Sequence, residues 1–522
     1  MRALNLLALT VVSGLSCLHA QDQRGVGFRA EWTVDWTRTY RTSFDDGATY
    51  GAAKSPRPML VLCWYPALLG TEASELHHRD YLGVEPDVAA LRALARAHAK
   101  YTREVLVQET MDAAEAALDG ARHEQLAQLL DAPTGCFDGA EPEPGLFPIL
   151  VQHSGAGSSY EDDAAHCVAL ARRGYVVATG AFLDGGGADL GVDGRLDSGL
   201  DMAFLAAWAA REVNGDFDRI GYLGHSLGAQ AVLRDAVRHG APPDVAVLLD
   251  STLDYYATGV PGWTKLIDHV SVRAERLRAP MLVVAGPGAT FELVDSLVAS
   301  ERTYATFPGL GHNEFIAQGD QRNARVIAQG AAGEELAYAR AARSRYRELV
   351  EYVGAYLDAH LKNESGALER LNAGYGASEL GAAIHVERAA VGERGVVLEG
   401  FDVGRAPTPR EFSAWVRSGD IEGLCAAIEA APPEIDAPIF STNMLWGSTL
   451  YTLLRAGRVE DARRLYATAL PRRPAVLSSL TFLALMAEMT DRPDDARDLL
   501  ESVLVLEPQH EEALERLRSL GD

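Results

Sequence analysis

The stretch IGYLGHSLGAQAVL, from Ile220 to Leu233, carries the clearest structural signal in the chain. The apolar run Ile220 to Leu223 leads straight into Gly224-His225-Ser226-Leu227-Gly228, and a helix-forming run begins at Ala229. A serine on a strand-to-helix elbow needs glycine on both sides, because the turn is strained and the helix packs close against the strand. Such a turn lifts the serine hydroxyl above the sheet. The sequence therefore predicts Ser226 as a nucleophile.

Strands and helices alternate on both sides of this elbow. The apolar patterns predict strands at Phe147–Gln152, Tyr175–Thr179, Ile220–Leu223, Val245–Leu249, Met281–Ala285 and Thr303–Phe307. They predict helices at Asp163–Arg173, Asp197–Arg211, Ala229–His239 and Ala342–Leu361. This alternation indicates an α/β fold, with a mostly parallel sheet that helices cover on both faces.

A serine nucleophile needs a base and an acid, and in this fold they follow it in the order serine, acid, histidine. His312 lies in a glycine-containing loop directly after the last predicted strand, so it is the expected base. Asp250 ends the strand that follows the nucleophile helix and is the first choice for the acid. Glu292, after the next strand, and Asp254 remain as alternatives.

The tetrahedral intermediate of acyl transfer needs two backbone N–H donors for its oxyanion. The amide of Leu227, directly after the nucleophile, is the expected first donor. The loop after the first central strand, His153-Ser154-Gly155-Ala156-Gly157, should supply the second, because its small residues let a substrate approach the backbone. Gly155 is the preferred residue, with Ala156 as the alternative.

Residues from about Arg57 to Leu371 resemble the α/β-hydrolases, in the dienelactone hydrolase-like and platelet-activating factor acetylhydrolase-like branch. The resemblance is carried by five segments, which are Val61–Ala67, Pro148–Gly157, Arg172–Ala178, Asp218–Gly228 and Tyr352–Lys362. In acetylhydrolases of this kind the acid follows the strand after the nucleophile helix, which implies Asp250. The family's oxyanion loop is usually His-Gly-x-Gly, and in this chain Ser154 intervenes.

The chain divides into several regions. Residues 21–375 form the expected α/β-hydrolase domain, with antiparallel strands from Phe28 to about Pro66 and a helical insert at about 70–132. A linker is expected at 376–404 and an all-helical domain at 405–522. In this last region the interval from Ala462 to Ala496 is the same as that from Pro474 to Pro508. It matches the period of about 34 residues that is typical of tetratricopeptide-like helix pairs, whose concave face commonly binds a protein partner.

The N-terminal residues predict where the protein is located, and the net charge excludes one class of ligand. Residues 1–20 have a basic start, a short apolar run and a small residue at Ala20, which predicts a signal peptide and export to the periplasm or medium. Lipidation at Cys17 is the alternative. With 522 residues and a net charge of −25, the chain should bind no nucleic acid, since phosphate backbones would repel it. The sequence predicts no transmembrane segment after the signal peptide.

No metal or organic cofactor is expected. The acidic loop around Asp184, Asp189, Asp193 and Asp197 does not have the spacing of a known calcium loop. The four cysteines beyond Cys17 are scattered, and they lack the C-x-x-C spacing of a zinc site.

These features together predict an exported serine hydrolase that cleaves small-molecule or lipid carboxylic esters through Ser226, His312 and Asp250. A binding protein with a vestigial hydrolase core is one alternative. A peptidase or amidase that uses the same triad is the other.

Overall fold

The structure of the chain is a computed structural model. It describes residues 24–39, 55–111, 114–183, 194–237, 243–255, 267, 270–372, 384–393, 407–431, 443–489 and 492–520. The expected signal peptide and most of the expected linker lie outside these ranges.

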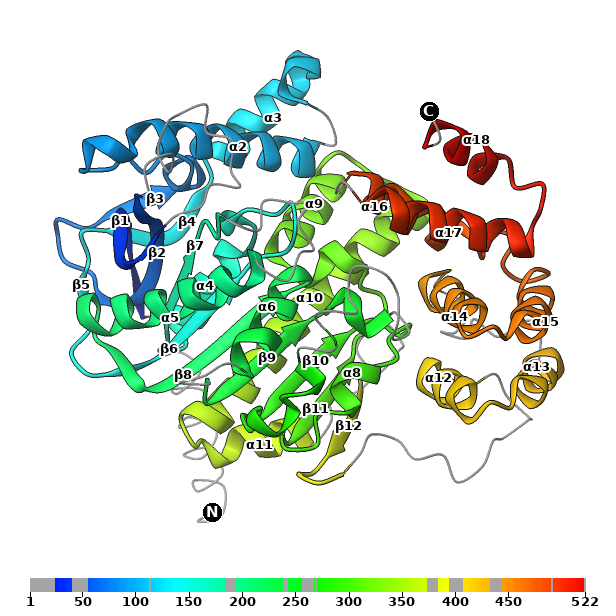
Figure 1. Cartoon of the computed structure of the whole chain (residues 1–522). Helices are drawn as coiled ribbons and strands as arrows, with labels where there is room; N and C mark the ends of the chain where they lie inside the picture. Colours follow the sequence, from blue (N-terminus) through cyan, green and yellow to red (C-terminus); the bar gives the residue numbers. More distant parts are fainter. Residues whose placement is uncertain are drawn as a thin grey trace, which may run out of the picture.

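A single twisted sheet forms the centre of the molecule (Figure 1), and its strand order is β12-β11-β10-β9-β8-β6-β7-β2-β1-β4-β3, with β5 paired to β2. The strands from β7 to β11 are parallel, whereas β2, β1 and β12 add antiparallel edges. The parallel strands are β6 (Phe147–His153), β7 (Val176–Gly180), β8 (Gly215–His225), β9 (Val245–Leu249), β10 (Met281–Ala285) and β11 (Arg302–Thr306). The remaining strands are β1 (Gly25–Thr39), β2 (Pro56–Leu68), β3 (Ser74–His77), β4 (Pro133–Asp138), β5 (Glu141–Pro142) and β12 (His385–Ala389).

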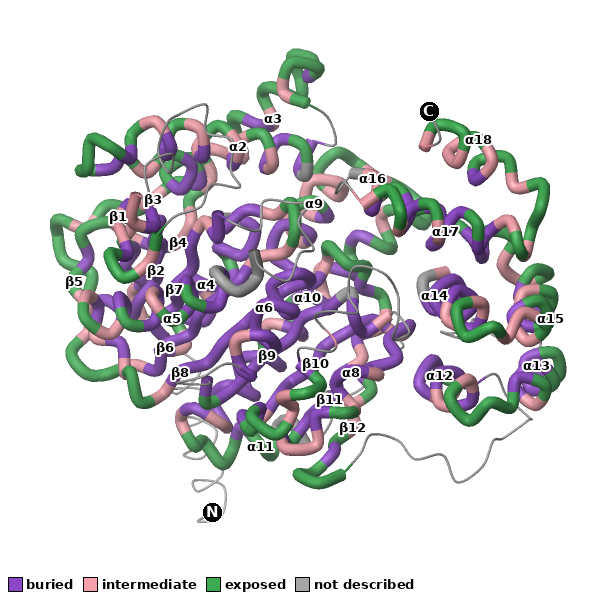
Figure 2. Tube along the Cα trace, viewed as in Figure 1, coloured by how far each residue is buried: buried purple, intermediate pink, exposed green. Residues whose placement is uncertain are grey.

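Helices cover the sheet on both faces, as the alternating pattern predicts. The helices α5 (Gly194–Glu212) and α6 (Leu227–Ala236) pack on one face, and α4 (Ala164–Arg172) and α10 (Gly333–Leu361) pack on the other. Every residue of β7, β9 and β10 is buried, which accounts for their continuous apolar sequences. Figure 2 shows this buried sheet as the core of the molecule.

The insert after β2 is mixed rather than purely helical. Its helices are α2 (Arg92–Met111) and α3 (Gly120–Leu130), but β3 precedes them and pairs with β4. The insert also reaches α9 (Ala317–Ala328), since α2 packs against this helix and Gln329 donates a hydrogen bond to Gln125 at 3.0 Å. Strand β3 is too short to give a periodic signal, so the sequence pattern does not reveal it.

The sheet extends into the segment expected to be a linker. Strand β12 pairs antiparallel with β11 along its whole length, from Arg302 opposite Ala389 to Thr306 opposite His385. The sheet therefore ends near residue 390 rather than 375. Pairing covers the outer edge of β11, which would otherwise present unpaired backbone groups.

The C-terminal region is helical, as expected. Figure 1 shows its helices stacked in pairs beside the β12 edge of the sheet. The helices are α12 (Pro409–Ser418), α13 (Ile421–Ala430), α14 (Asn443–Arg455), α15 (Val459–Ala469), α16 (Ser478–Met489), α17 (Pro493–Leu506) and α18 (Glu511–Ser519). Ala462 and Ala496, the two alanines of the repeated interval, are both fully buried in the second helix of their pairs. Small residues at these positions let the paired helices approach closely.

No helix among the described residues is long and apolar enough to cross a membrane. The four cysteines beyond the N-terminal segment are Cys63, Cys136, Cys167 and Cys425, and all of them are buried and free.

Candidate active site

Ser226 occupies a strained turn between β8 and α6. Its backbone has φ 53° and ψ −115°, a conformation that a residue with a side chain rarely adopts. The glycines on either side permit the turn. A Cβ on Gly224 would lie 2.4 Å from Gly228, and a Cβ on Gly228 would lie 2.1 Å from the carbonyl oxygen of His153. Both positions therefore require glycine, because neighbouring backbone atoms lie where a side chain would begin.

His312 begins the short 3-10 helix η7 (His312–Phe315), in the loop region that follows β11. Its Nε2 lies 3.0 Å from the Oγ of Ser226, and its Nδ1 lies 2.6 Å from Oδ2 of Asp250. Because a carboxylate only accepts, Nδ1 carries the proton and Nε2 can accept the serine proton. The side chain of His312 is 41% exposed, whereas that of Asp250 is 3% exposed.

Asp250 directly follows β9, with a backbone φ of 46° that turns its side chain toward the histidine loop. Its buried carboxylate is satisfied on both oxygens. Oδ2 accepts from His312, and Oδ1 accepts from the hydroxyl of Tyr255 and, at 3.1 Å, from the backbone N–H of Gly286. These donors offset the cost of burying the carboxylate.

Tyr255 is a member of the site that the sequence analysis missed. Its hydroxyl donates to Asp250 and accepts from the N–H of Gly286 at 2.8 Å. Burial, and then the charge of Asp250, raises the pKa of Tyr255 well above its usual value, so the hydroxyl stays a donor. Nothing in the sequence distinguishes it from its neighbour Tyr256, because its role depends on the short 3-10 helix η5 (Thr252–Tyr255) that follows β9.

The contacts in the structure distinguish Asp250 from the two alternative candidates for the acid. Glu292 lies in α8 (Glu292–Asp295) and forms an ion pair with Arg417 of α12 at 2.8 Å. Asp254 is buried, and burial followed by the charge of Asp250 raises its pKa well above the usual value. Of the three acids, only Asp250 is within hydrogen-bond distance of His312 among the contacts of the described residues.

The expected oxyanion residues lie beside the serine. Leu227 is the first residue of α6, where the backbone N–H has no acceptor within the helix and the helix dipole favours negative charge. A Cβ on Gly155 would lie 3.2 Å from the Cβ of Ser226, so the backbone of Gly155 is packed against the serine. The ring of Phe182 stacks on His153 with centroids 3.8 Å apart, and this contact supports the loop.

His225 is a second residue whose role the sequence pattern does not show. Its Nε2 donates to the backbone carbonyl of His312 at 3.0 Å, and the two rings are 4.7 Å apart. Burial, with a contribution from the charge of His312, lowers the pKa of His225 to about 3. His225 is therefore neutral at ordinary pH and fixes the backbone that carries His312.

No group of His, Cys, Asp or Glu among the described residues is arranged to hold a metal ion. The acidic loop from Asp184 to Asp193 falls in a part of the chain that the structure does not describe, and so does the side chain of Asp197.

Comparison with protein-family models and with curated proteins finds no match for this chain. Among solved structures, a ferulic acid esterase from Streptomyces cinnamoneus is similar, with a TM-score of 0.44 and 19% sequence identity. The similarity covers 66% of this chain and 92% of that chain. At this level of similarity the neighbour gives no information about the substrate of this protein.

Proposed function

We propose that this protein is a serine hydrolase that cleaves carboxylic esters. The observation that carries the proposal is the unbroken chain of contacts from Ser226 Oγ to His312 Nε2 at 3.0 Å and from His312 Nδ1 to Asp250 Oδ2 at 2.6 Å. A nucleophile, a base in contact with it and a third group that orients the base are the features of covalent acyl transfer.

In the proposed mechanism Ser226 Oγ attacks the ester carbonyl while His312 Nε2 takes its proton. Asp250 holds the imidazole in the required tautomer and stabilises the imidazolium that forms. His312 then gives the proton to the leaving alcohol, and an acyl-enzyme remains on Ser226. Water repeats the sequence and releases the acid. These steps need no metal or organic cofactor.

We assign the oxyanion hole to the backbone N–H groups of Leu227 and Gly155. Two features support this assignment. Leu227 lies at the N-terminus of α6, and the backbone of Gly155 packs against Ser226. Both donors belong to the backbone, so they need no reorganisation when the negative charge develops.

The finer expectations are part of the same proposal. We propose that residues 1–20 direct export to the periplasm or medium, and that the enzyme belongs to the acetylhydrolase-like branch. We also propose that the C-terminal helices are tetratricopeptide-like repeats that bind a protein partner. The burial of both Ala462 and Ala496, at equivalent places in successive helix pairs, supports this last assignment.

The test is labelling with a fluorophosphonate, followed by assays with p-nitrophenyl esters of increasing acyl length. The wild-type chain should be labelled and should turn over esters. Ser226→Ala should lose the label and lose several orders of magnitude in turnover, with unchanged folding. The matched control is Ser418→Ala in α12, whose hydroxyl donates to the carbonyl of Trp415 at 2.7 Å and which should behave as wild type.

Each alternative predicts a different result. Persistent labelling of folded Ser226→Ala would overturn the nucleophile assignment. Labelling with amide turnover but no ester turnover would indicate a peptidase or amidase. A folded wild-type chain that takes no label and turns over neither substrate would indicate a binding protein.

A further inference from the structure

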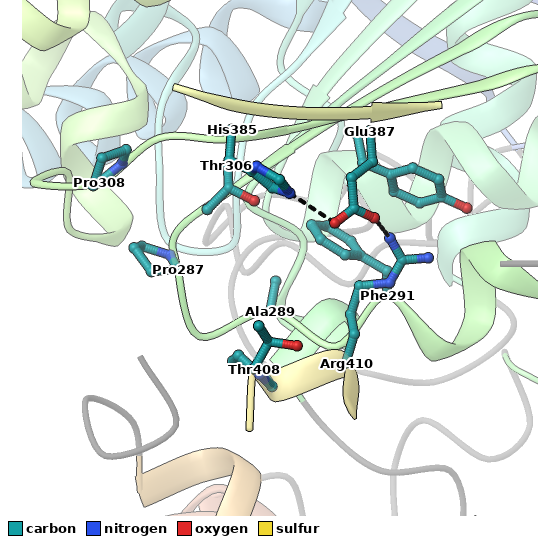
Figure 3. A pocket seen from close by; sticks show the side chains of 11 residues that line it. Pro287, Ala289, Phe291, Thr306, Pro308, His385, Glu387, Thr408 and Arg410 are labelled. Carbon is teal, nitrogen blue, oxygen red and sulfur yellow. Dashed lines mark hydrogen bonds and ion pairs between the residues drawn. The ribbon is translucent and has the colours of Figure 1, made fainter. Parts of the chain in front are cut away.

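Several buried charged side chains outside the proposed triad form ion pairs that join neighbouring elements. Figure 3 shows one example at the edge of the sheet, where buried Arg410 of α12 pairs with Glu387 of β12. Asp163 is different. It is 1% exposed, and no cation among the described residues lies near enough to lower its pKa. A buried carboxyl without a cation is costly, so its other contacts indicate what it does.

Asp163 does not cap the helix that it precedes. It ends the short 3-10 helix η4 (Tyr160–Asp163) and is the N-cap residue of α4. An aspartate at this position commonly accepts a hydrogen bond from the first turn of its own helix, but the side chain of Asp163 makes no such bond. Its carboxyl instead contacts two other elements, β6 and α9.

The first contact leads to the oxyanion loop, residues His153–Gly157. Gln152 Nε2 donates to Asp163 Oδ2 at 2.7 Å, and both side chains are buried. Gln152 is the last residue of β6 before this loop, in which Gly155 packs against Ser226. Asp163 therefore holds the end of the strand from which the oxyanion loop starts.

The second contact leads to the base. The backbone N–H of Ala317, the first residue of α9, donates to the carboxyl of Asp163. The N–H groups in the first turn of a helix have no acceptor within it, and the helix dipole favours a negative group there. The N-cap residue of α9 is Ile316, which makes no side-chain cap bond. Asp163 thus supplies an acceptor to this helix end from another element.

The first turn of α9 packs tightly on the turn that carries His312. A Cβ on Gly319 would lie 2.1 Å from the carbonyl oxygen of Asn313 and 2.7 Å from the Cα of Glu314. Both of these residues belong to η7, which begins at His312. Because this contact leaves no space, a shift of α9 would move η7 with it.

The carboxyl of Asp163 therefore connects two parts of the proposed site. His312 exchanges a proton with Ser226, while Gly155 is assigned to the oxyanion that forms on the same carbonyl carbon. We propose that Asp163 is a positioning residue of the esterase, which holds the oxyanion loop and the His312 turn at a fixed separation. This inference rests on the proposed function. A misplacement of about 1 Å in an active site can cost about a hundredfold in rate.

The first test is Asp163→Asn, which keeps the shape of the side chain but replaces one acceptor oxygen with a donor. One of the two contacts should then be lost. We expect a folded chain whose kcat for p-nitrophenyl acetate is lowered about tenfold to a hundredfold, with KM within about threefold of wild type. Rates are measured well below the unfolding temperature of each variant, so a change in stability alone does not affect them.

The second test exchanges the two groups. In the double variant Gln152→Glu/Asp163→Asn, the amide at position 163 can donate to the carboxyl at position 152, and its oxygen can accept from Ala317. We expect kcat to return to within about threefold of wild type. Gln152→Met removes the same contact from its other end. It should show the loss expected of Asp163→Asn, and it replaces that variant if the latter does not fold.

The matched control is Asp358→Asn in α10. Asp358 is equally buried, but it pairs with Arg173 at 2.7 Å and with Lys362 at 2.9 Å. This variant should lose stability and keep the wild-type kcat. An equal loss of kcat in Asp358→Asn would show a general effect of removing a buried charge and would contradict the proposal.

Two further results would overturn the proposal. One is a folded Asp163→Asn variant whose kcat is within twofold of wild type. The other is a double variant that is no more active than Asp163→Asn, since the proposal depends on the contact with Gln152. A wild-type chain that fluorophosphonate does not label would instead overturn the proposed function, so the two failures are distinguishable.

Discussion

The sheet region, the described residues of 24–393, and the C-terminal helical region, the described residues of 407–520, differ in backbone conformation. Six described residues other than glycine have a positive φ, and all six lie in the sheet region, at Phe182, Asn214, Ser226, Asp250, Phe291 and Asn363. In the described part of 407–520, positive φ occurs only at Gly419 and Gly457, in turns between helices. Two of the six strained residues are the proposed nucleophile and acid. Backbone strain is thus present at the proposed nucleophile and acid, whereas in the described helical region a positive φ falls only on glycines, which adopt it without strain.

The two regions also differ in which polar groups they bury. The sheet region buries several carboxylates and imidazoles, whereas the described helical region buries serine and threonine side chains and Arg410. The helical region keeps its acids near the surface in repeated local pairs. Arg458 pairs with Asp461 at 2.7 Å, and at the corresponding place in the next helix pair Arg492 pairs with Asp495 at 2.8 Å. Chemistry that needs ionisable groups with a shifted pKa or a fixed orientation is therefore expected in the sheet region.

We expect the largest loss of activity from a substitution at Asp250, which lies in the sheet region. Asp250→Asn should lower ester turnover on the order of 10⁴-fold, because an amide cannot hold the tautomer that His312 needs. Glu292→Gln is the matched control, since it removes an acid that pairs with Arg417 rather than with the histidine. Steady-state rates with p-nitrophenyl acetate measure both. A larger loss in Glu292→Gln would move the acid to the loop after β10.

The sequence predicts those parts of the site that depend on neighbouring residues and on the order of the strands. The elbow at Ser226 depends on neighbouring glycines, and the order of serine, acid and histidine follows from successive strands of one sheet. The structure brings Ser226, His312 and Asp250 into contact in a single chain of hydrogen bonds. Tyr255, His225 and Asp163 could not be found in this way, because each acts through a contact that exists only after distant segments have packed.

The second prediction concerns Asp163, a buried carboxylate of the sheet region. Burial raises the pKa of Asp163 to about 7, and the hydrogen bonds from Gln152 and from the backbone of Ala317 only partly offset it. The folded chain thus holds this proton more tightly than the unfolded chain. The contribution of Asp163 to stability should therefore fall as pH rises from about 4 to about 7, by up to about 4 kcal/mol. Asp163→Asn cannot titrate and should lack this part of the pH dependence.

Urea unfolding at several pH values measures the difference between wild type and Asp163→Asn. Asp358→Asn is the control, because the contribution of Asp358 to stability changes with pH in the opposite direction. Although burial opposes it, the charges of Lys362 and Arg173 lower the pKa of Asp358, so its stabilising contribution is lost as pH falls. A constant difference between wild type and Asp163→Asn across this range would show that Asp163 is not perturbed.

The third prediction concerns Tyr255, which positions Asp250 without touching the substrate. Tyr255→Phe removes one donor to the buried carboxylate and leaves Gly286 and His312 in place. We expect about a tenfold loss in turnover, in line with the loss of one hydrogen bond to a charged group. Steady-state rates with p-nitrophenyl acetate measure the loss. A folded Tyr255→Phe variant with wild-type turnover would contradict the positioning role of Tyr255.

The smallest effect on activity is expected from removal of the helical region. A chain that ends at Glu393 keeps β12 and every residue of the proposed triad, so turnover of p-nitrophenyl acetate should stay within about threefold of the full chain. Its stability should fall, because the ion pairs of Arg410 and Arg417 with the sheet edge are lost. A chain that ends at Asn372 also loses β12 and exposes the edge of β11, so it should aggregate more readily in light scattering. If the chain ending at Glu393 is folded by circular dichroism but inactive, the helical region shapes the active site, and the division between the two regions is wrong.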